Sequence, residues 1–263
     1  MAAMNWFRFA SPASFYPIAG PLTAVFGWVA VALAVAGLYA GFVIAPTDAQ
    51  QGESYRIIFI HVPAAWMAML IYVVIAFWSL FSLTLNARLP AMMAQALAPT
   101  GAMFAFIALW TGAFWGRPTW GTYWVWDARL TSTLVLLFLY LGLIALRSAI
   151  DDPRRADRAC ALLALVGVVN VPIIYFSVRW WNTLHQGATI SMTAAPKMAQ
   201  TMLTAMLLMT FAAWSYAIAT ALHRVRTLII EREALSDWVG RFIAESPAKA
   251  ANDPAAAPRH GGV

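Results

Sequence analysis

The stretch Ile57–Leu85 reads IIFIHVPAAWMAMLIYVVIAFWSLFSLTL and contains no acidic or basic side chain, if histidine is counted as neutral. A helix needs about 20 mostly apolar residues to cross the hydrocarbon core of a bilayer. This stretch is therefore predicted to span a membrane, and it decides the fold class of the chain. Five further stretches have the same character: Pro21–Ile44, Leu97–Trp115, Leu130–Leu146, Ala159–Val178 and Pro196–Leu222.

The composition of the 263-residue chain agrees with this interpretation. Of its residues, 62% are apolar and 11% are charged, whereas soluble domains are about 45–50% apolar and about 25% charged. We predict an all-α polytopic membrane protein with six transmembrane helices, formed by residues 1–222. The single cysteine, Cys160, excludes an internal disulfide, a CxxC redox pair and a covalent CxxCH haem site.

The distribution of basic residues predicts the orientation of the chain. With six spans both termini lie on one side, and that side holds 12 of the 17 basic residues, many of them in the short loop Arg147–Arg158. Cytoplasmic loops carry an excess of lysine and arginine. We therefore predict cytoplasmic termini and a tryptophan-rich periplasmic loop, residues 115–131, between helices three and four. Because this topology accounts for the net charge of +6, no nucleic-acid partner is expected.

Residues 223–263 are predicted to form a cytoplasmic tail. Leu228, Leu235, Trp238 and Phe242 recur at helical spacing among charged residues, which is typical of an amphipathic helix on lipid or against a partner. A surface helix without a specific role explains the pattern equally well. From Ser246 onward, the composition of alanine, proline, glycine and scattered charges predicts disorder.

Two of the four histidines fall on the predicted outer side. His61 is expected at the mouth of a helix whose first turn holds Pro63, and His185 lies in the loop between spans five and six. Two imidazoles from two loops can ligate one metal, and haem iron needs only two axial protein ligands. Zinc needs three or four ligands, and no other histidine or cysteine falls on this side. Either histidine alone is better explained as an amphipathic side chain at the membrane boundary, whereas for the pair on one side the two explanations are equally good.

The loop between spans three and four, residues 115–131, is unusually rich in tryptophan. Tryptophan prefers the headgroup level of a membrane, so an aromatic belt is the simplest explanation, but a belt would spread over both interfaces. If the loop is helical, Trp120, Trp124 and Asp127 share one face, and such an apolar shelf suits a large flat ligand such as a porphyrin. Three arginines could contact the propionates of such a ligand, namely Arg117, Arg129 and Arg179. Each of them could equally be an interfacial anchor.

The motif Trp-Gly-x-x-Trp-x-Trp-Asp-x-Arg-Leu-Thr at Trp120–Thr131 is similar to the signature of the WWD haem-handling proteins of cytochrome c biogenesis. With six spans and one histidine in each flanking outer loop, the chain most resembles the haem-handling C branch of that family. The resemblance implies that His61 and His185 are axial ligands of haem b, which is bound transiently as cargo. It also implies a platform for haem and a chaperone, formed by Trp115, Trp120, Gly121, Trp124, Trp126 and Asp127.

The resemblance further implies a place of action and a set of partners. The haem site would face the periplasm from a bacterial inner membrane, and haem would pass to a membrane-anchored periplasmic haem chaperone. The other implied partners are the soluble ATPase and second membrane subunit of an ATP-binding cassette complex, a small one-span subunit, and membrane lipid. The chain itself has no GxxxxGK[ST] phosphate loop.

Other function classes remain open at the level of the sequence. A b-type haem electron-transfer anchor would carry its histidines inside the spans, facing one another. A polytopic small-molecule transporter would carry ionisable groups near the membrane midplane, and a structural subunit would use its tryptophans only as a belt. Because the chain shows no nucleophile–base pair and no paired acids within a span, we expect a carrier and not an enzyme.

Overall fold

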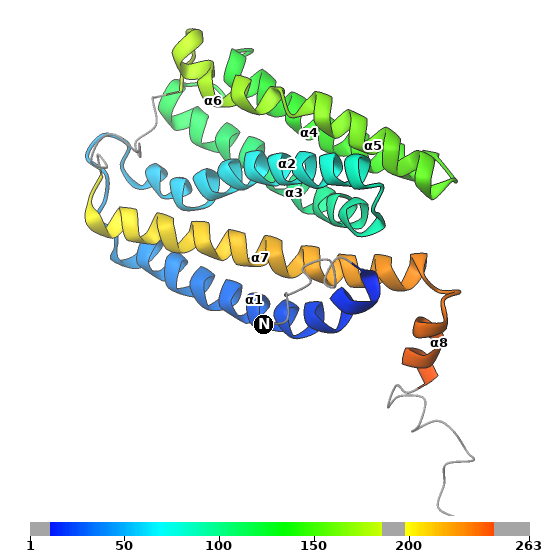
Figure 1. Ribbon diagram of the computed structural model, residues 1–263. Coiled ribbons are helices and arrows are strands. Elements are labelled where there is room, and N and C mark those ends of the chain that lie inside the picture. The colour runs from blue at the N-terminus through cyan, green and yellow to red at the C-terminus, as the bar shows by residue number, and fades with distance from the viewer. Residues whose placement is uncertain (1–10, 186–197, 245–263) are drawn as a thin grey trace, which may run out of the picture.

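A computed structural model of the chain describes residues 11–185 and 198–244. These residues form helices and no β-strand (Figure 1). The elements are α1 (Pro12–Tyr39), the π-helical turn η2 (Ala40–Ile44), the 3-10 helix η3 (Glu53–Ile57), α2 (Ile58–Leu85), α3 (Arg88–Trp120), α4 (Ala128–Ala149), α5 (Pro153–Gly167), α6 (Asn170–Trp180), α7 (Gln200–Arg232) and α8 (Asp237–Ala244).

Six helical segments of the described chain are long and apolar enough to cross a membrane, which confirms the predicted fold class. Three of them are single helices, namely α3, α4 and α7. The other three are composite, because η2 extends α1, η3 leads into α2, and α5 and α6 follow one another within one span. The chain is therefore a multi-pass membrane protein.

The first and last spans extend beyond their predicted limits. The first helix was expected to start at Pro21 but starts at Pro12, because Ser11 caps it by accepting a hydrogen bond from the backbone N–H of Ser14. The last helix does not stop at Leu222 but continues to Arg232. It continues because polar side chains of its last turns find partners on neighbouring helices, such as Asp157 in α5.

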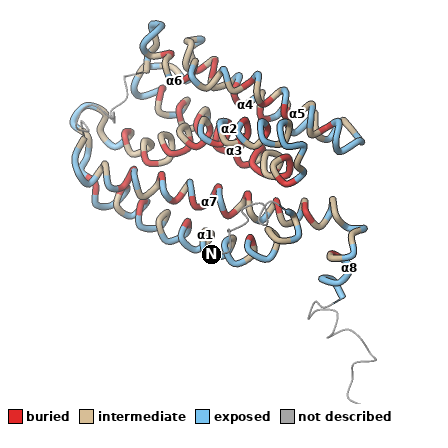
Figure 2. The backbone as a smooth tube through the Cα atoms, viewed as in Figure 1, coloured by how far each residue is buried: buried red, intermediate tan, exposed pale blue. Residues whose placement is uncertain are grey.

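Successive spans run antiparallel, and the helices divide into two groups (Figure 1). α2 to α6 form one group, and α7 packs between that group and α1. Buried positions lie where helices meet, whereas the outer faces are exposed (Figure 2). Large apolar side chains stand on these outer faces, with Trp28 75% and Phe138 59% exposed. A surface of this kind is suited to contact with lipid.

The two ends of the bundle differ in chemistry. We call the end with the connections after η2, α3 and α6 the tryptophan end, because it holds the tryptophan-rich segment 115–127. The opposite end, with the connections after α2 and α4 and the end of α7, is the arginine end. Its arginines include Arg88, Arg147, Arg154, Arg155, Arg158, Arg224 and Arg232.

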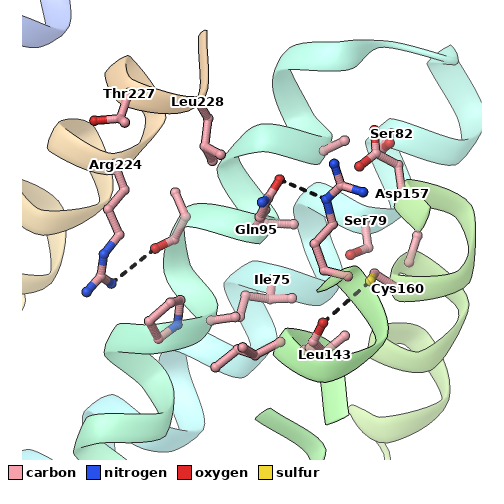
Figure 3. Close-up of a pocket in the computed structure, with 18 of the residues that line it drawn as sticks. Ile75, Ser79, Ser82, Gln95, Leu143, Asp157, Cys160, Arg224, Thr227 and Leu228 are labelled. Atoms are coloured by element: carbon pink, nitrogen blue, oxygen red, sulfur yellow. Dashed lines mark hydrogen bonds between the residues drawn. The ribbon is translucent and has the colours of Figure 1, made fainter. Parts of the chain in front are cut away.

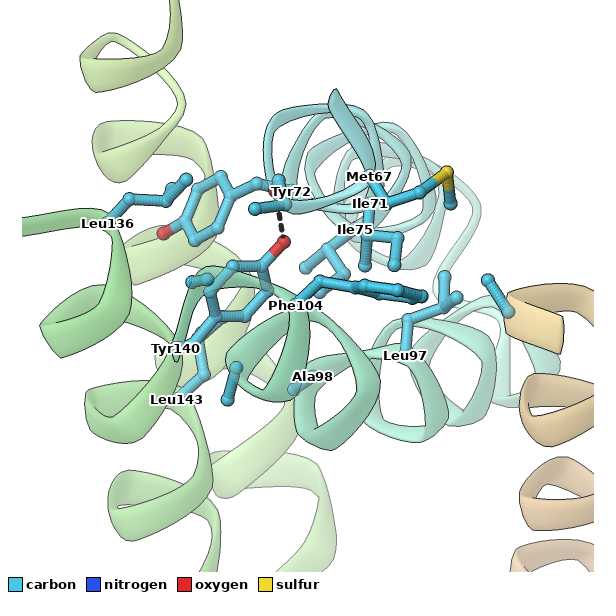
Figure 4. Close-up of a cluster of buried hydrophobic side chains, with 14 of the residues drawn as sticks. Met67, Ile71, Tyr72, Ile75, Leu97, Ala98, Phe104, Leu136, Tyr140 and Leu143 are labelled. Atoms are coloured by element: carbon cyan, nitrogen blue, oxygen red, sulfur yellow. Dashed lines mark hydrogen bonds between the residues drawn. The ribbon is translucent and has the colours of Figure 1, made fainter. Parts of the chain in front are cut away.

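A layer of buried tyrosines closes the middle of the bundle (Figure 4). The hydroxyl of Tyr140 in α4 donates a hydrogen bond to the carbonyl of Ala68 in α2, at 2.6 Å. The Tyr140 ring packs edge-on against Tyr72, with 5.1 Å between the centroids. Gly101 of α3 makes room for this ring, since a Cβ there would lie 2.1 Å from Tyr140 Cε1. We call Tyr72, Gly101 and Tyr140 the tyrosine layer.

Gly101→Ala is expected to destabilise the protein by about 1–3 kcal/mol, because an added methyl group in a packed core forces side chains and backbone apart. Gly27→Ala is the matched control, since a Cβ at Gly27 of α1 meets nothing within 4 Å. That control should be neutral or slightly stabilising, because alanine favours a helix over glycine. Thermal unfolding in detergent measures both changes, and equal melting temperatures would contradict the packing described for Tyr140.

Candidate functional site

His61 lies in the first turn of α2, at the tryptophan end. It was expected to precede a helix that starts at Pro63, but η3 runs directly into α2 and places Pro63 in the second turn. His61 is thus part of the helix and faces α3. Gly112 of α3 permits this approach, because a Cβ there would lie 2.9 Å from His61 Cε1.

Thr111 of α3 holds the imidazole of His61 in place. His61 Nδ1 lies 3.1 Å from Thr111 Oγ1. The one proton of the Thr111 hydroxyl is donated to the carbonyl of Ile107, 2.6 Å away, so the hydroxyl oxygen accepts from His61 Nδ1–H. Nε2 of His61 is then the nitrogen with a free lone pair. A metal-bound histidine is commonly oriented by a hydrogen bond from its other ring nitrogen.

His185 follows α6 and is held near the start of α4 by Asp127. One carboxylate oxygen of Asp127 caps α4 by accepting from the N–H of Leu130, at 2.7 Å. The other oxygen accepts from the N–H of Leu184, at 3.3 Å, and lies 3.8 Å from His185 Nδ1. That distance is too long for a hydrogen bond. Nδ1 of His185 is therefore buried without a hydrogen-bond partner among the described residues.

The structure brings His61 and His185 together. Both line one cavity of about 30 Å³, which Arg129 of α4 also lines. Burial and the positive charge of Arg129 together lower the pKa of His185 to about 4, against the opposing effect of Asp127. His185 is therefore neutral at physiological pH, which is the form of imidazole that binds a metal.

The tryptophan-rich segment does not form one continuous helix. α3 ends at Trp120, and Gly121 takes a left-handed conformation with φ of 78°, while its N–H bonds to the carbonyl of Arg117 at 3.0 Å. This is a common way for a helix to end. The chain then runs without regular structure to Asp127, which starts α4. Trp120, Trp124 and Asp127 therefore do not lie on one helix face.

Two tryptophans instead flank the two histidines. Trp115 packs edge-on against His61, with 5.6 Å between the ring centroids, and Trp120 packs against His185, at 4.8 Å. The indole N–H of Trp115 donates to the side chain of Gln51, at 2.7 Å, and so ties α3 to the segment before α2. Each of the two histidines thus has one tryptophan ring packed against it.

Trp124 and Trp126 form a separate pair, with 5.4 Å between their centroids. Trp126 is 77% exposed, whereas Trp124 is half-buried and its indole N–H has no partner among the described residues. Of the three predicted propionate contacts, only Arg129 lines the histidine cavity. Arg117 and Arg179 are exposed, and Arg117 donates to the carbonyl of Gly121.

The donor atoms suit haem iron better than a bare metal ion. No group of three or more histidine, cysteine, aspartate or glutamate side chains in the described part of the chain could hold a metal ion, whereas haem iron requires only two axial ligands. The cavity of about 30 Å³ has room for about one water molecule. Ligation of one haem by both imidazoles therefore requires the segment that carries His185 to move away from α2.

Three residues of this site were not predicted from the sequence, namely Gln51, Thr111 and Gly112. The one signal for Thr111 is its place as a hydroxyl residue in an otherwise apolar run, one helical turn before Trp115. Asp127 was predicted to belong to the aromatic platform. Its contacts assign it to the positioning of His185 and of α4.

Thr111→Val is expected to lower haem affinity about 10–100-fold, the usual cost of removing a group that orients a metal-bound histidine. Valine keeps the shape of threonine but cannot accept the His61 Nδ1–H hydrogen bond. Thr119→Val is the matched control, because Thr119 also donates to a carbonyl of α3, that of Trp115, and no hydrogen bond joins it to a histidine. Haem titration followed by absorption measures both affinities, and equal values for the two variants would contradict the role of Thr111.

Comparisons with known proteins agree with the resemblance noted in the motif Trp120–Thr131. Residues 5–240 match the family described as Heme exporter protein C. The chain is 48% identical over 220 residues to Heme exporter protein C of Escherichia coli strain K12, an alignment that covers 82% of this chain and 88% of that protein.

Two further relatives are similarly close. Heme exporter protein C of Haemophilus influenzae is 42% identical over 231 residues, which cover 88% of this chain and 94% of that protein. A ccmC-like mitochondrial protein of cytochrome c biosynthesis from Marchantia polymorpha is 46% identical over 166 residues, or 63% of this chain and 69% of that protein. With a family match over most of its length and relatives of this similarity, the chain belongs to the Heme exporter protein C family.

Proposed function

We propose that the chain binds haem b as transient cargo at its tryptophan end and delivers it for the maturation of c-type cytochromes. The names of its relatives, which refer to heme export and to cytochrome c biosynthesis, support this function. The observation that carries the proposal is that His61 and His185, from distant parts of the chain, line one cavity and that a tryptophan packs against each of them. Such a pair matches the two axial positions of haem iron.

Each group around the pair has a distinct role in this proposal. His61 and His185 hold the iron, and Arg129 neutralises a propionate from within the same cavity. Trp115 and Trp120 form the walls against which the porphyrin lies. Two imidazole ligands leave iron without an open position for oxygen chemistry, so the chain acts as a carrier and not as an enzyme. Release then requires that another ligand, such as a histidine of the receiving protein, replaces one imidazole.

The receiving protein is, in this proposal, a membrane-anchored haem chaperone of the periplasm. The basic residues at the arginine end favour a cytoplasmic location for that end, which directs the tryptophan end to the periplasmic face of a bacterial inner membrane. Trp126 is available to a partner, because it is 77% exposed, and it directly precedes Asp127, which contacts the His185 segment. A soluble ATPase, a second membrane subunit and a small one-span subunit complete the proposed assembly, as expected for an ATP-binding cassette complex.

Trp126→Ala is expected to leave haem binding nearly intact and to lower transfer to the chaperone about tenfold, since it removes an exposed contact and no iron ligand. A factor of ten corresponds to about 1.4 kcal/mol, and tryptophans that dominate an interface contribute about 2 kcal/mol or more. Trp28→Ala is the matched control, because Trp28 is similarly exposed, at 75%, and belongs to α1, which contributes no residue to the histidine cavity. The measurement is paired: haem content of the purified protein, and covalent haem on a co-expressed chaperone.

The role of the tryptophan segment fails if a variant that lacks Trp120, Trp124 and Trp126 together transfers haem normally. These side chains would then serve only as an aromatic belt at the membrane interface. Loss of all haem from the Trp126 variant alone would instead make this side chain part of the haem-holding site. That result would contradict the division between iron ligands and a docking surface.

A further inference from the structure

A second cavity lies at the arginine end, among five helices (Figure 3). Its volume is about 440 Å³, within the range of about 300–1,000 Å³ that is usual for sites of small molecules. Figure 3 shows that its labelled side chains come from α7 on one side, from α2 and α3 in the middle, and from α4 and α5 on the other. No residue of the histidine cavity lines it.

The tyrosine layer separates the two cavities. In α2, Tyr72 lies between the residues that line the histidine cavity and those that line the second one, and the same is true of Gly101 in α3 and Tyr140 in α4. Tyr72 and Tyr140 have no exposed surface. A ligand in the second cavity is therefore independent of the ligands His61 and His185.

The walls of the second cavity are mostly apolar. One part is formed by alanines of α3 that leave open space where larger side chains would fill it, and other parts come from α2, α4 and α7. The apolar residues are Ile75, Ala91, Ala94, Ala96, Ala98, Pro99, Leu143, Ile144, Ala161 and Leu228. An apolar lining of this extent suits the body of an apolar or amphiphilic molecule.

Two arginines in this cavity lack an acidic partner. Arg232 at its edge is neutralised by Asp157, through two hydrogen bonds of 2.8 and 2.9 Å. Arg147 contacts only the side chain of Gln95, at 3.4 Å, and Arg224 donates to the hydroxyl of Thr100, at 2.7 Å. Within the described part of the chain, neither Arg147 nor Arg224 forms an ion pair.

Arg147 and Arg224 in the lining are balanced by Asp157 and Glu231, but Asp157 is paired with Arg232 outside the lining, which leaves an excess of one positive charge. Besides Asp157, the only acidic residue of the cavity is Glu231, which is exposed and offsets one of the two free arginines. Arg147 and Arg224 are each partly buried, and an arginine away from bulk water gains from pairing with a carboxylate or phosphate. Since they come from α4 and α7, on two sides of the apolar walls, each can pair with an anionic group of a ligand that fills the apolar space between them.

We propose that this cavity binds an anionic amphiphile, with its apolar body between α3 and α4 and its carboxylate or phosphate on Arg147 and Arg224. Two sources offer this chemistry. One is haem, whose propionates are carboxylates on a large apolar ring, and the other is an anionic phospholipid of the membrane leaflet at the arginine end. The proposal does not depend on the function of the histidine cavity.

The test uses the full-length chain with His61→Ala and His185→Ala, so that no haem signal comes from the histidine cavity. In one arm, haem is titrated and followed by absorption. In the other arm, retention of phosphatidylglycerol and of phosphatidylcholine is compared by native mass spectrometry. Arg147→Gln and Arg224→Gln, singly and together, are compared with Arg154→Gln and Arg158→Gln, which alter exposed arginines at the same end.

We expect the double change at Arg147 and Arg224 to weaken binding of one of the two ligands at least tenfold, and the control changes to leave it unaltered. Such a loss for haem identifies the cargo as the ligand, whereas such a loss for phosphatidylglycerol identifies a lipid. The proposal is wrong if binding of neither ligand depends on Arg147 or Arg224. It is also wrong if phosphatidylcholine binds as well as phosphatidylglycerol and haem binding does not depend on these arginines.

The same arginine changes in a chain with intact His61 and His185 control for folding. Haem bound by the histidine pair should then be retained, because the tyrosine layer separates the two cavities. A chain that binds haem through its histidines but shows no arginine-dependent ligand overturns this inference and leaves the proposed function in place. A chain that shows the arginine-dependent ligand but no histidine-dependent haem supports this inference and overturns the proposed function.

Discussion

Replacing either His61 or His185 by alanine is expected to lower haem affinity by about 100-fold or more. A change that only disturbs the orientation of a metal ligand already costs about 10–100-fold, and here the ligand itself is lost. The double variant should lose less than the sum of the two single losses, because one iron joins both imidazoles and interactions within one site are not additive. Haem titration of the purified variants gives the three affinities.

His223→Ala is the control for this experiment. His223 is an exposed histidine at the arginine end, separated from the pair by the tyrosine layer, so its loss should leave haem affinity at the pair unchanged. Strict additivity of the two single losses would mean that His61 and His185 bind haem at separate sites. An effect of His223 as large as that of His61 would contradict the location of the site.

Asp127→Ala is expected to produce the next largest effect, a loss of haem affinity of about 10–100-fold. The change removes the cap of α4, which is usually worth about 0.5–2 kcal/mol, and also the bond to the Leu184 N–H that holds the His185 segment. Asp127→Asn keeps one acceptor oxygen and should fall between wild type and Asp127→Ala. Absorption titration with haem and thermal unfolding measure the two consequences separately.

Asp152→Ala provides a matched control for the helix cap. Asp152 caps α5 by accepting from the N–H of Arg155, at 2.8 Å, at the arginine end and far from the histidines. The control should lower the melting temperature about as much as Asp127→Ala while haem affinity is retained. If both variants bind haem equally well, Asp127 is only a helix cap, and its hydrogen bond to the Leu184 N–H does not contribute to haem binding.

The number of spans could be predicted from the sequence, because each apolar stretch is long enough to cross a bilayer and each corresponds to one helical segment, single or composite. The ends of the helices were harder to predict. Pro17 and Pro21 lie inside α1, although proline is normally read as a helix start or break. The last turns of α7 contain charged residues that resemble a separate tail, but Arg224 and Arg232 bond to α3 and α5.

The candidate site was predicted in its ligands but not in its geometry. Counting spans placed His61 and His185 on the same side, and the structure brings them to one cavity. The hydrogen bond from His61 to Thr111 and the link from Leu184 to Asp127 join residues that are 50 and 57 positions apart. No local pattern reports such pairs, because they depend on how the helices pack. The left-handed Gly121 ends α3 and so replaces the helical shelf by an irregular segment.

The electron paramagnetic resonance spectrum of the ferric haem-loaded protein shows whether His61 and His185 hold one haem iron between them. Two imidazole ligands impose a strong field on iron, so we expect a low-spin, six-coordinate signal for the wild-type chain. In His61→Ala or His185→Ala, the remaining haem should show a high-spin signal, since one axial ligand is missing. A high-spin signal from the wild type, or a low-spin signal that survives in both single variants, would mean that the two histidines do not share one iron.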